Sequence, residues 1–263
     1  MLEQREGIKF FTSGLLAEGR GVTHAFLTRA GGSSPAPFDT MNLGADCGDD
    51  PVNVAANAKR LSEVFGFRPE RLTTAKQVHG FMMVTVRDRG GAVYSGIESD
   101  ALATPTPGVP VGVLTADCVP LLIHAPAAGA VAAVHAGWKG AAAGIARRSV
   151  NVMAGKFSTS PGEMVAAIGP RIGPCCYTVG AEVPDAFRED FGEGLEYFSE
   201  KDDGTFTLDL GEATRAQLIE AGMTEANIEV IDACTACDPD LFFSYRRDGE
   251  RTGRQLSFIM VEG

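Results

Sequence analysis

The apolar stretch from Val111 to Gly140 contains one cysteine and two of the four histidines of the chain. Its sequence, VGVLTADCVPLLIHAPAAGAVAAVHAGWKG, is typical of buried strands, and Cys118, His124 and His135 interrupt it. A thiolate and imidazoles are ligands that zinc prefers in proteins. The residue types therefore indicate a metal site. The alternative is that these are ordinary core residues, because free cysteine is among the most buried residue types.

Two strands are expected on either side of the short segment PAAG (126–129), and they would form an antiparallel hairpin. A turn centred on this segment places position 118 opposite about position 137, within two residues of His135. Opposed residues of a hairpin have Cβ atoms about 5 Å apart, so their side chains can reach one metal ion. His124 lies at the far end of the hairpin. We therefore keep His135 as a ligand and leave His124 out.

A third ligand must come from another part of the chain. We assign His79, in the segment KQVHG at the end of an expected strand, because His24 lies in the interior of the first strand. One thiolate and two imidazoles would leave the fourth position of a tetrahedral zinc open, as in catalytic zinc sites. Such an ion would polarise a substrate and lower the pKa of a bound water. The predicted ligands are therefore His79, Cys118 and His135, with zinc as the metal and copper as the alternative.

Two further features beside the ligands could contribute to catalysis. Asp117 precedes Cys118 and faces the opposite side of a regular strand, so it could orient a neighbouring group, relay a proton or cap a backbone amide. After the hairpin the chain turns into an expected helix, whose first amides could bind an anion together with Lys139. The alternative is that Gly137 and Gly140 only allow a tight turn.

Arginines near glycines in the segments RIGPCCYTVG and SYRRDGERTGRQ could each bind phosphate or carboxylate through two hydrogen bonds. Arg171, Arg246 and Arg254 are candidates for such binding, with solvated surface charge as the alternative. We interpret Arg247 and Arg251 as surface charges.

The segment CTAC, from Cys234 to Cys237, could be redox-active or form half of a zinc site. No second CxxC or histidine pair in the sequence completes a four-ligand set, and the adjacent Cys175 and Cys176 form a poor chelating pair. We therefore interpret these four cysteines as packing residues.

Composition limits the classes of partner. The 263-residue chain has a net charge of −11 and a pI near 4.9, which argues against nucleic acid or an anionic membrane because phosphates require a cationic surface. No apolar run approaches the roughly 18 residues of a membrane span. The segment MLEQREGIKFFTSG lacks the apolar core of a signal peptide. We therefore expect a cytoplasmic protein whose six cysteines are thiols.

Periodicity and turn signals predict a mixture of helices and strands without the strict alternation of a doubly wound fold. Strands are expected at 21–29, 73–88, 111–116, 119–125, 130–136, 165–170, 228–233 and 255–262. Helices are expected at 49–67, 138–156, 182–191 and 210–222, with Asp50 and Asp209 as N-caps and Pro51 as a first residue. The pattern predicts one domain over 1–263, layered, of class α/β or α+β, with mixed sheets.

Several motifs along the chain resemble the YfiH-like laccase-domain family, long labelled multicopper polyphenol oxidases. They are, in order, FLTRAGGSS, FDTMNLG, GDDPVNVAANAKRL, KQVHG, TADCVPLL, AAVHAGWKG, IGPRIGPCCYTVG and FFSYRRDGERTGRQ. The pair TADC and HAGWKG is highly specific, and the match covers essentially the whole chain. One departure is Lys139, where the family more often carries arginine, and a lysine keeps a cation at this position.

The resemblance implies an α/β/β/α sandwich with zinc bound by the residues that match His79, Cys118 and His135. We add Asp117 as a catalytic residue because it lies beside Cys118 and could relay a proton. The resemblance also implies phosphorolysis of adenosine, inosine, guanosine and methylthioadenosine, and hydrolytic deamination of adenosine. Bacterial members resemble editing factors that keep peptidoglycan precursors correct. The residues expected to bind the nucleoside and phosphate are Asn42, Gln77, Lys139, Arg171, Arg246 and Arg254.

Three other hypotheses stay open. A multicopper oxidase needs a histidine-rich trinuclear cluster, and four histidines are too few, but a single copper with Met82 or Met83 as axial ligand would suit a polyphenol oxidase. A cysteine amidase acting on peptidoglycan precursors would use Cys118 as nucleophile and His135 as base. A non-catalytic binding module would use the metal only for stability.

Overall fold

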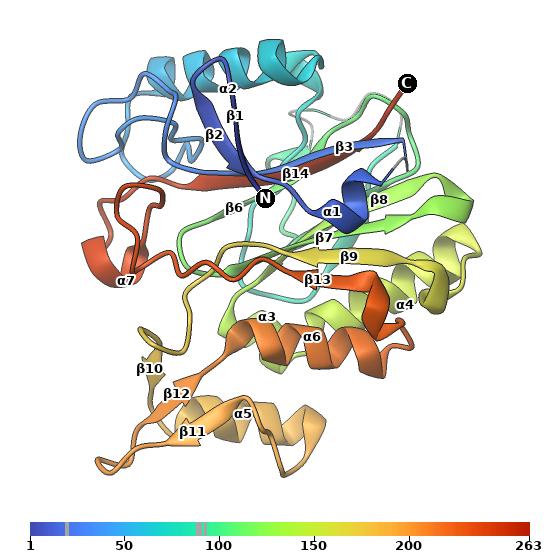
Figure 1. Cartoon of the computed structure of the whole chain (residues 1–263), viewed down its shortest axis with the longest axis vertical. Coiled ribbons are helices and arrows are strands. Elements are labelled where there is room, and N and C mark those ends of the chain that lie inside the picture. The colour runs from blue at the N-terminus through green and yellow to red at the C-terminus, as the bar shows by residue number, and fades with distance from the viewer. Residues whose placement is uncertain (19–20, 88–90, 92–93) are drawn as a thin grey trace.

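The computed structural model of the protein describes residues 1–18, 21–87, 91 and 94–263. In this part of the chain two large β-sheets pack face to face, and helices cover both outer faces (Figure 1). The order of layers is helix, sheet, sheet, helix. The predicted α/β/β/α sandwich with mixed sheets is confirmed.

The five-stranded sheet is antiparallel and joins the two ends of the chain. In spatial order its strands are β1 (Leu2–Arg5), β2 (Ile8–Phe11), β3 (Val22–Leu27), β14 (Gln255–Val261) and β6 (Val111–Thr115). The predictions of strands at 21–29, 111–116 and 255–262 are therefore confirmed with slightly shorter bounds. Strands β1 and β2 were not predicted from the sequence.

The six-stranded sheet is mixed and contains the hairpin. In spatial order its strands are β13 (Ile228–Val230), β9 (Val165–Ile168), β7 (Val119–Ala125), β8 (Ala130–Ala136), β5 (Ala101–Thr104) and β4 (Met83–Thr85). The outer pairs β13–β9 and β4–β5 are parallel, and the inner pairs are antiparallel. The prediction of a strand over 73–88 is wrong, since only β4 forms there; residue 88 lies outside the described residues.

Strands β7 and β8 are apolar at nearly every position because both of their faces are buried. Leu121 and Ile123 face the helices on the outer side of the sheet, whereas Leu122 faces the five-stranded sheet. The same alternation places Val131 and Ala133 of β8 between the two sheets. The two large sheets therefore share this core.

Helix α2 (Pro51–Phe65) covers the outer face of the five-stranded sheet (Figure 1). Its Phe65 ring lies 5.0 Å from the ring of Phe10 and 5.1 Å from that of Phe258, measured between centroids. The Asp50 carboxylate accepts a hydrogen bond from Val52 N at 2.8 Å, so the predicted N-cap is confirmed.

The helices on the other outer face are α3 (Trp138–Ala142), α4 (Ile145–Phe157), α5 (Glu182–Phe191) and α6 (Leu210–Glu220). The predicted helix over 138–156 is wrong in one respect: it is broken at Gly144, which has the left-handed φ of 72°. The N-cap Asp209 is confirmed, since its carboxylate accepts from Glu212 N at 3.0 Å.

Smaller elements complete the described chain. A three-stranded sheet of β10 (Thr178–Val179), β12 (Phe206–Leu208) and β11 (Phe198–Glu200) lies beside α5 at one end of the molecule (Figure 1). The short helices are α1 (Gly14–Ala17) and α7 (Tyr245–Asp248), with 3-10 turns at Pro69–Arg71, Pro126–Ala128, Pro161–Glu163 and Glu225–Asn227. Among the described residues no helix combines the length and the apolar character needed to cross a membrane.

His24 of β3 is buried in the neutral form. Its Nε2 accepts a hydrogen bond from Ser13 N at 2.9 Å, and burial lowers its pKa to about 4, against an attraction from Glu229 that raises it. In the unfolded chain a histidine has a pKa of about 6.5. The unfolded chain therefore binds a proton as the pH falls from about 6.5 to about 4, whereas the folded protein does not. Folding free energy is lost across this window.

We expect the variant His24→Gln to lose less stability on acidification than the natural chain. Between pH 7 and pH 5 the contribution of His24 should fall by about 2 kcal/mol, and a glutamine, which keeps an acceptor for Ser13 N, has no such term. Urea unfolding of both proteins at the two pH values measures the difference. Equal losses in the two proteins would show that His24 is not protonated on unfolding.

Candidate metal centre

The hairpin brings two of the predicted ligands together as expected. Val119 pairs with Ala136 and Pro120 with His135, so position 118 stands opposite position 137. Side-chain nitrogens of His79 and His135 and the sulfur of Cys118 all lie within 4.8 Å of one another. The sulfur is 3.9 Å from His79 Nε2. Sulfur and nitrogen ligands of one tetrahedral zinc lie about 3.5 Å apart, so the arrangement fits a single ion.

His79 does not lie in a strand, contrary to the prediction. It has a left-handed backbone, with φ of 59°, in a turn that wraps around the carboxylate of Asp100. That carboxylate accepts hydrogen bonds from the backbone amides of Val78, His79 and Gly80 at 3.2, 2.9 and 2.7 Å. The turn therefore presents the His79 ring to the hairpin.

Asp100 also holds the second histidine. Its Oδ1 accepts from His135 Nδ1 at 2.8 Å, with both side chains buried, and this leaves His135 Nε2 for a metal. Burial raises the pKa of Asp100, but the hydrogen bond from His135 and those from the turn outweigh it and lower the pKa. Asp100 was not predicted from the sequence as a site residue. The available signal was a carboxylate directly before the apolar run ALAT, at the start of a strand beside β8.

The sulfur of Cys118 carries negative charge at neutral pH. Burial raises the pKa of this thiol, but the charge of His135 and hydrogen bonds from His135 and His79 outweigh it and lower the pKa to about 6. For His135 burial lowers the pKa, and the Cys118 thiolate and Asp100 outweigh this and raise it to about 9. The pair is a thiolate beside an imidazolium, and a metal would replace the proton between them.

Two glycines allow the ligands to approach. A Cβ on Gly137 would lie 2.7 Å from Cδ2 of His79 and 3.1 Å from the Cys118 sulfur, and a Cβ on Gly140 would lie 2.7 Å from Gly80 O. The glycines of AGWKG therefore do more than allow a tight turn, since they make room for the loop that carries His79.

Asp117 anchors two distant segments to the ligand strand. It has a left-handed φ of 92°, and its carboxylate accepts from Thr235 Oγ1 and from Arg246 N, both at 2.6 Å. Asp117 also belongs to the lining of a cavity over the proposed ligands. Each of its carboxylate oxygens already accepts one of these two hydrogen bonds.

A cavity of about 810 Å³ opens over the three ligands. Its other lining residues include the aromatic residues Trp138, Tyr177 and Tyr245, the cations Lys76, Arg246 and Arg254, and Gln77.

Two of these side chains are held by the protein. The Arg246 guanidinium lies 4.9 Å from the centre of the Tyr177 ring and donates to Thr178 O at 3.0 Å. Gln77 exchanges two hydrogen bonds of 2.8 Å with the backbone of Leu114 in β6. Flat apolar surfaces and cations thus face one space.

Three predicted substrate-binding residues, Asn42, Lys139 and Arg171, lie outside this lining. Asn42 is buried and accepts from Arg254 N at 2.9 Å, so it holds the cavity wall. Arg171 is buried and donates to Ile231 O at 3.1 Å, and the ammonium group of Lys139 lies 5.6 Å from the Trp138 ring. Their contacts in the structure are with the protein itself.

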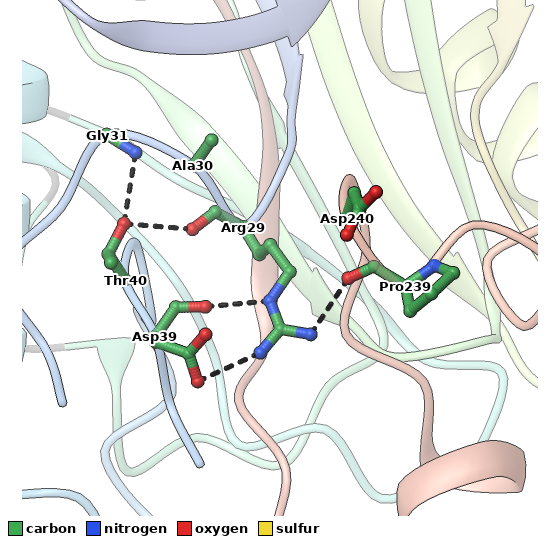
Figure 2. A pocket seen from close by; sticks show the side chains of 7 residues that line it. All are labelled: Arg29, Ala30, Gly31, Asp39, Thr40, Pro239 and Asp240. Atoms are coloured by element: carbon green, nitrogen blue, oxygen red, sulfur yellow. Dashed lines mark hydrogen bonds and ion pairs between the residues drawn. The ribbon is translucent and has the colours of Figure 1, made fainter. Parts of the chain in front are cut away.

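A smaller cavity of about 400 Å³ lies near the start of the chain (Figure 2). Its one arginine, Arg29, is held by the protein, since it donates to Asp39 O at 2.7 Å and Pro239 O at 3.0 Å and pairs with the Asp39 carboxylate at 3.1 Å. Its lining contains no histidine or cysteine. The larger cavity, whose lining includes His79, Cys118 and His135, is therefore the candidate functional site.

Comparison with known proteins identifies the family. Residues 23–262 match the family model described as multi-copper polyphenol oxidoreductase laccase. The purine nucleoside phosphorylase YlmD of Geobacillus stearothermophilus is 41% identical over 246 residues, which cover 91% of this chain and 90% of the relative. This chain belongs to the YfiH-like laccase-domain family.

Other members agree with this assignment. The purine nucleoside phosphorylase YfiH of Escherichia coli strain K12 is 38% identical over 242 residues, covering 92% of this chain and 95% of the relative. The crystal structure of YlmD from Geobacillus stearothermophilus superposes with a TM-score of 0.93 at 38% identity, covering 100% of this chain and 99% of the other. The resemblance drawn from the sequence motifs is thus confirmed.

We expect Asp100→Asn to weaken metal binding in this family member. Asparagine presents a donor where the carboxylate accepts, so His135 and the His79 turn lose their common anchor, and zinc affinity should fall by about 10- to 100-fold. Competition with a zinc-binding dye measures the affinity. The control is Glu98→Gln, which removes an exposed carboxylate two residues away that pairs with Lys76. If Asp100→Asn binds zinc as the control does, Asp100 does not position the ligands.

Proposed function

We propose that this protein is a zinc-dependent purine nucleoside phosphorylase that also deaminates adenosine and cleaves methylthioadenosine. The observation that carries the proposal is the convergence of His79, Cys118 and His135 at a cavity lined by aromatic and cationic side chains. The names of the relatives, all purine nucleoside phosphorylases, support the same substrate class.

The donor set favours zinc over copper. One thiolate and two imidazoles with a fourth position open is the ligand pattern of catalytic zinc. A multicopper centre needs more histidines than the four of this chain, and two of these serve elsewhere: His24 accepts from Ser13 N, and His124 lies at the opposite end of the hairpin from His135. A zinc ion bound by the three ligands would supply Lewis acidity toward substrate oxygen or water.

In phosphorolysis the chain's own residues would bind and orient the two substrates. The rings of Trp138, Tyr177 and Tyr245 line the cavity and can stack on a purine, and Lys76, Arg246 and Arg254 offer positive charge to phosphate. A phosphate oxygen forms a bond to the ribose carbon C1′ while the bond from C1′ to the purine nitrogen breaks, and the base leaves. Holding both substrates in line removes most of the entropic barrier.

In deamination a water oxygen would add to the purine carbon that bears the amino group, and ammonia would leave. The proton of the water must pass to a nearby base. Asp117 is the neighbour of Cys118 and a carboxylate residue in the cavity lining. Its oxygens already accept from Thr235 and Arg246, which favours a positioning role over a proton relay.

We expect purified protein with adenosine and phosphate to produce adenine and ribose 1-phosphate, and adenosine without phosphate to yield inosine and ammonia. Chromatography resolves the four products. Removing the metal with a chelator should lower both rates at least about 100-fold, and added zinc should restore them. Absence of both free base and inosine from zinc-loaded protein would refute the proposal.

The same samples separate the alternatives. A polyphenol oxidase would contain copper, absorb visible light and oxidise a phenol with oxygen. A cysteine amidase is the second candidate, favoured by the lowered pKa of Cys118 beside His135. It would cleave a peptidoglycan peptide amide, lose activity in Cys118→Ser, and keep activity in the presence of a chelator.

We expect Asp117→Asn and Thr235→Val to lower deamination and phosphorolysis by similar factors of about 10. Each change removes a hydrogen bond between the ligand strand and the segment at 234–237, so both should loosen the cavity wall. Steady-state rates of both reactions in both variants measure this. If Asp117→Asn abolishes deamination alone while Thr235→Val leaves it intact, Asp117 is a proton relay instead.

The remaining parts of the proposal concern partners and location. We infer that the partners are a purine nucleoside and phosphate, with neither nucleic acid nor a membrane, and that the protein is cytoplasmic. The acidic composition, with a net charge of −11, supports the exclusion of nucleic acid. An additional role in editing peptidoglycan precursors stays an expectation from the family resemblance.

A further inference from the structure

Four cysteines outside the metal centre converge from two distant segments of the chain. Cys175 and Cys176 lie in the turn after β9, and Cys234 and Cys237 lie in the loop after β13. Their four sulfur atoms all lie within 4.8 Å of one another. The sulfur of Cys237 is 3.6 Å from that of Cys175 and 3.4 Å from that of Cys176. The fold therefore completes the set that the CTAC segment lacks in the sequence.

The packing interpretation of these cysteines does not explain their surroundings. Cys175 and Cys237 are exposed and the other two are half-buried, so none of the four lies in a core cluster of the described residues. Because these thiols are exposed or only half-buried, burial of apolar surface contributes little stability at these positions. Their common feature is that the four sulfurs lie within 4.8 Å of one another.

The spacing suits one tetrahedral ion. With zinc–sulfur bonds of about 2.3 Å, the sulfurs of a four-cysteine site lie about 3.8 Å apart, close to the two measured separations. A polynuclear iron–sulfur cluster would place several iron atoms between the cysteines and spread them further. Four thiolates also leave no position open for water or substrate, which is the pattern of a structural site.

We propose that Cys175, Cys176, Cys234 and Cys237 bind one structural Zn²⁺, separate from the ion of the catalytic centre. The four thiols release their protons as the four zinc–sulfur bonds form, so no oxidant or reductant takes part. These four cysteines are called the tetracysteine site below.

Backbone amides around the site are placed to stabilise thiolates. Gly173 N donates to the sulfur of Cys234 at 3.2 Å, and the amides of Ala236 and Cys237 also donate to it. Amide donors around metal-bound sulfur spread its negative charge and fix its orientation. The CTAC loop thus folds around the Cys234 sulfur.

A cation holds the same loop from outside. Arg247 donates to the carbonyls of Thr235 at 2.9 Å, Ala236 at 3.4 Å and Phe242 at 2.8 Å. The interpretation of Arg247 as a surface charge is therefore wrong, because its guanidinium is bound to the backbone. Its charge is balanced by the neighbouring Asp248 carboxylate, with which it forms hydrogen bonds of 2.8 and 2.7 Å. Arg247 therefore contributes to the site by holding the backbone of the loop.

The tetracysteine site would tie the two segments to the catalytic cavity. Two backbone hydrogen bonds join the segments: Thr235 N donates to Arg171 O at 2.9 Å, and Arg171 N donates to Ala233 O at 3.1 Å. Thr235 in turn donates its hydroxyl to Asp117, the neighbour of Cys118. An ion at the four cysteines would therefore hold a wall of the cavity without touching substrate.

The test counts zinc and identifies its ligands in the full-length protein, prepared with a thiol reductant and zinc. We expect two zinc ions per chain in the natural protein. In Cys118→Ser one ion should remain, with only sulfur neighbours in its X-ray absorption spectrum. Adding Cys234→Ser or Cys175→Ser to this variant should remove it, whereas adding Cys47→Ser, which changes a cysteine outside the site, should not.

Other outcomes would overturn the proposal. They are Cys118→Ser protein without tightly bound zinc, a remaining ion with nitrogen neighbours, or a disulfide among the four cysteines found by mass spectrometry of alkylated protein. If the double variants fail to fold, the absorption spectrum of Cys118→Ser alone decides. Since no readout uses nucleosides, failure here is independent of the catalytic proposal.

Discussion

One buried carboxylate organises the candidate metal centre. Asp100 collects four donors, namely Nδ1 of His135 and the amides of Val78, His79 and Gly80. A carboxylate buried without such partners would cost several kcal/mol, and amides of a turn left without an acceptor would also be penalised. The carboxylate and its donors therefore depend on each other. Two of the three proposed metal ligands, His79 and His135, are therefore positioned by the same group.

Local patterns were sufficient to predict one half of this centre. The apolar run with a short turn fixes the hairpin register, and that register places Cys118 and His135 at the same end of adjacent strands. The caps Asp50 and Asp209 were also predictable, because a cap and the amide it accepts from lie within three residues. The layered class followed from strands that are apolar on both faces, which need a layer on each side.

The other half depends on contacts between residues far apart in the chain. His79 is presented by a turn with a left-handed backbone, and its anchor Asp100 lies 21 residues later, so the alternation of a strand was misleading. The tetracysteine site needs segments separated by 61 and 62 residues. The helix over 138–156 was placed correctly but broken at Gly144, since apolar periodicity continues across the break while the backbone does not.

Two residues at the candidate metal centre, His79 and Asp117, have a strained backbone, and hydrogen bonds explain why the strain persists. His79 and Asp117 have φ of 59° and 92°, conformations that cost about 1–3 kcal/mol for a residue with a side chain. At His79 the amide donates to Asp100, and at Asp117 the carboxylate accepts from Thr235 and Arg246. Each strained residue is thus held by groups from distant segments. With both residues held in this way, the Cys118 sulfur lies 3.9 Å from His79 Nε2. The long-range hydrogen bonds therefore stabilise the backbone conformations on which the arrangement of the proposed ligands depends.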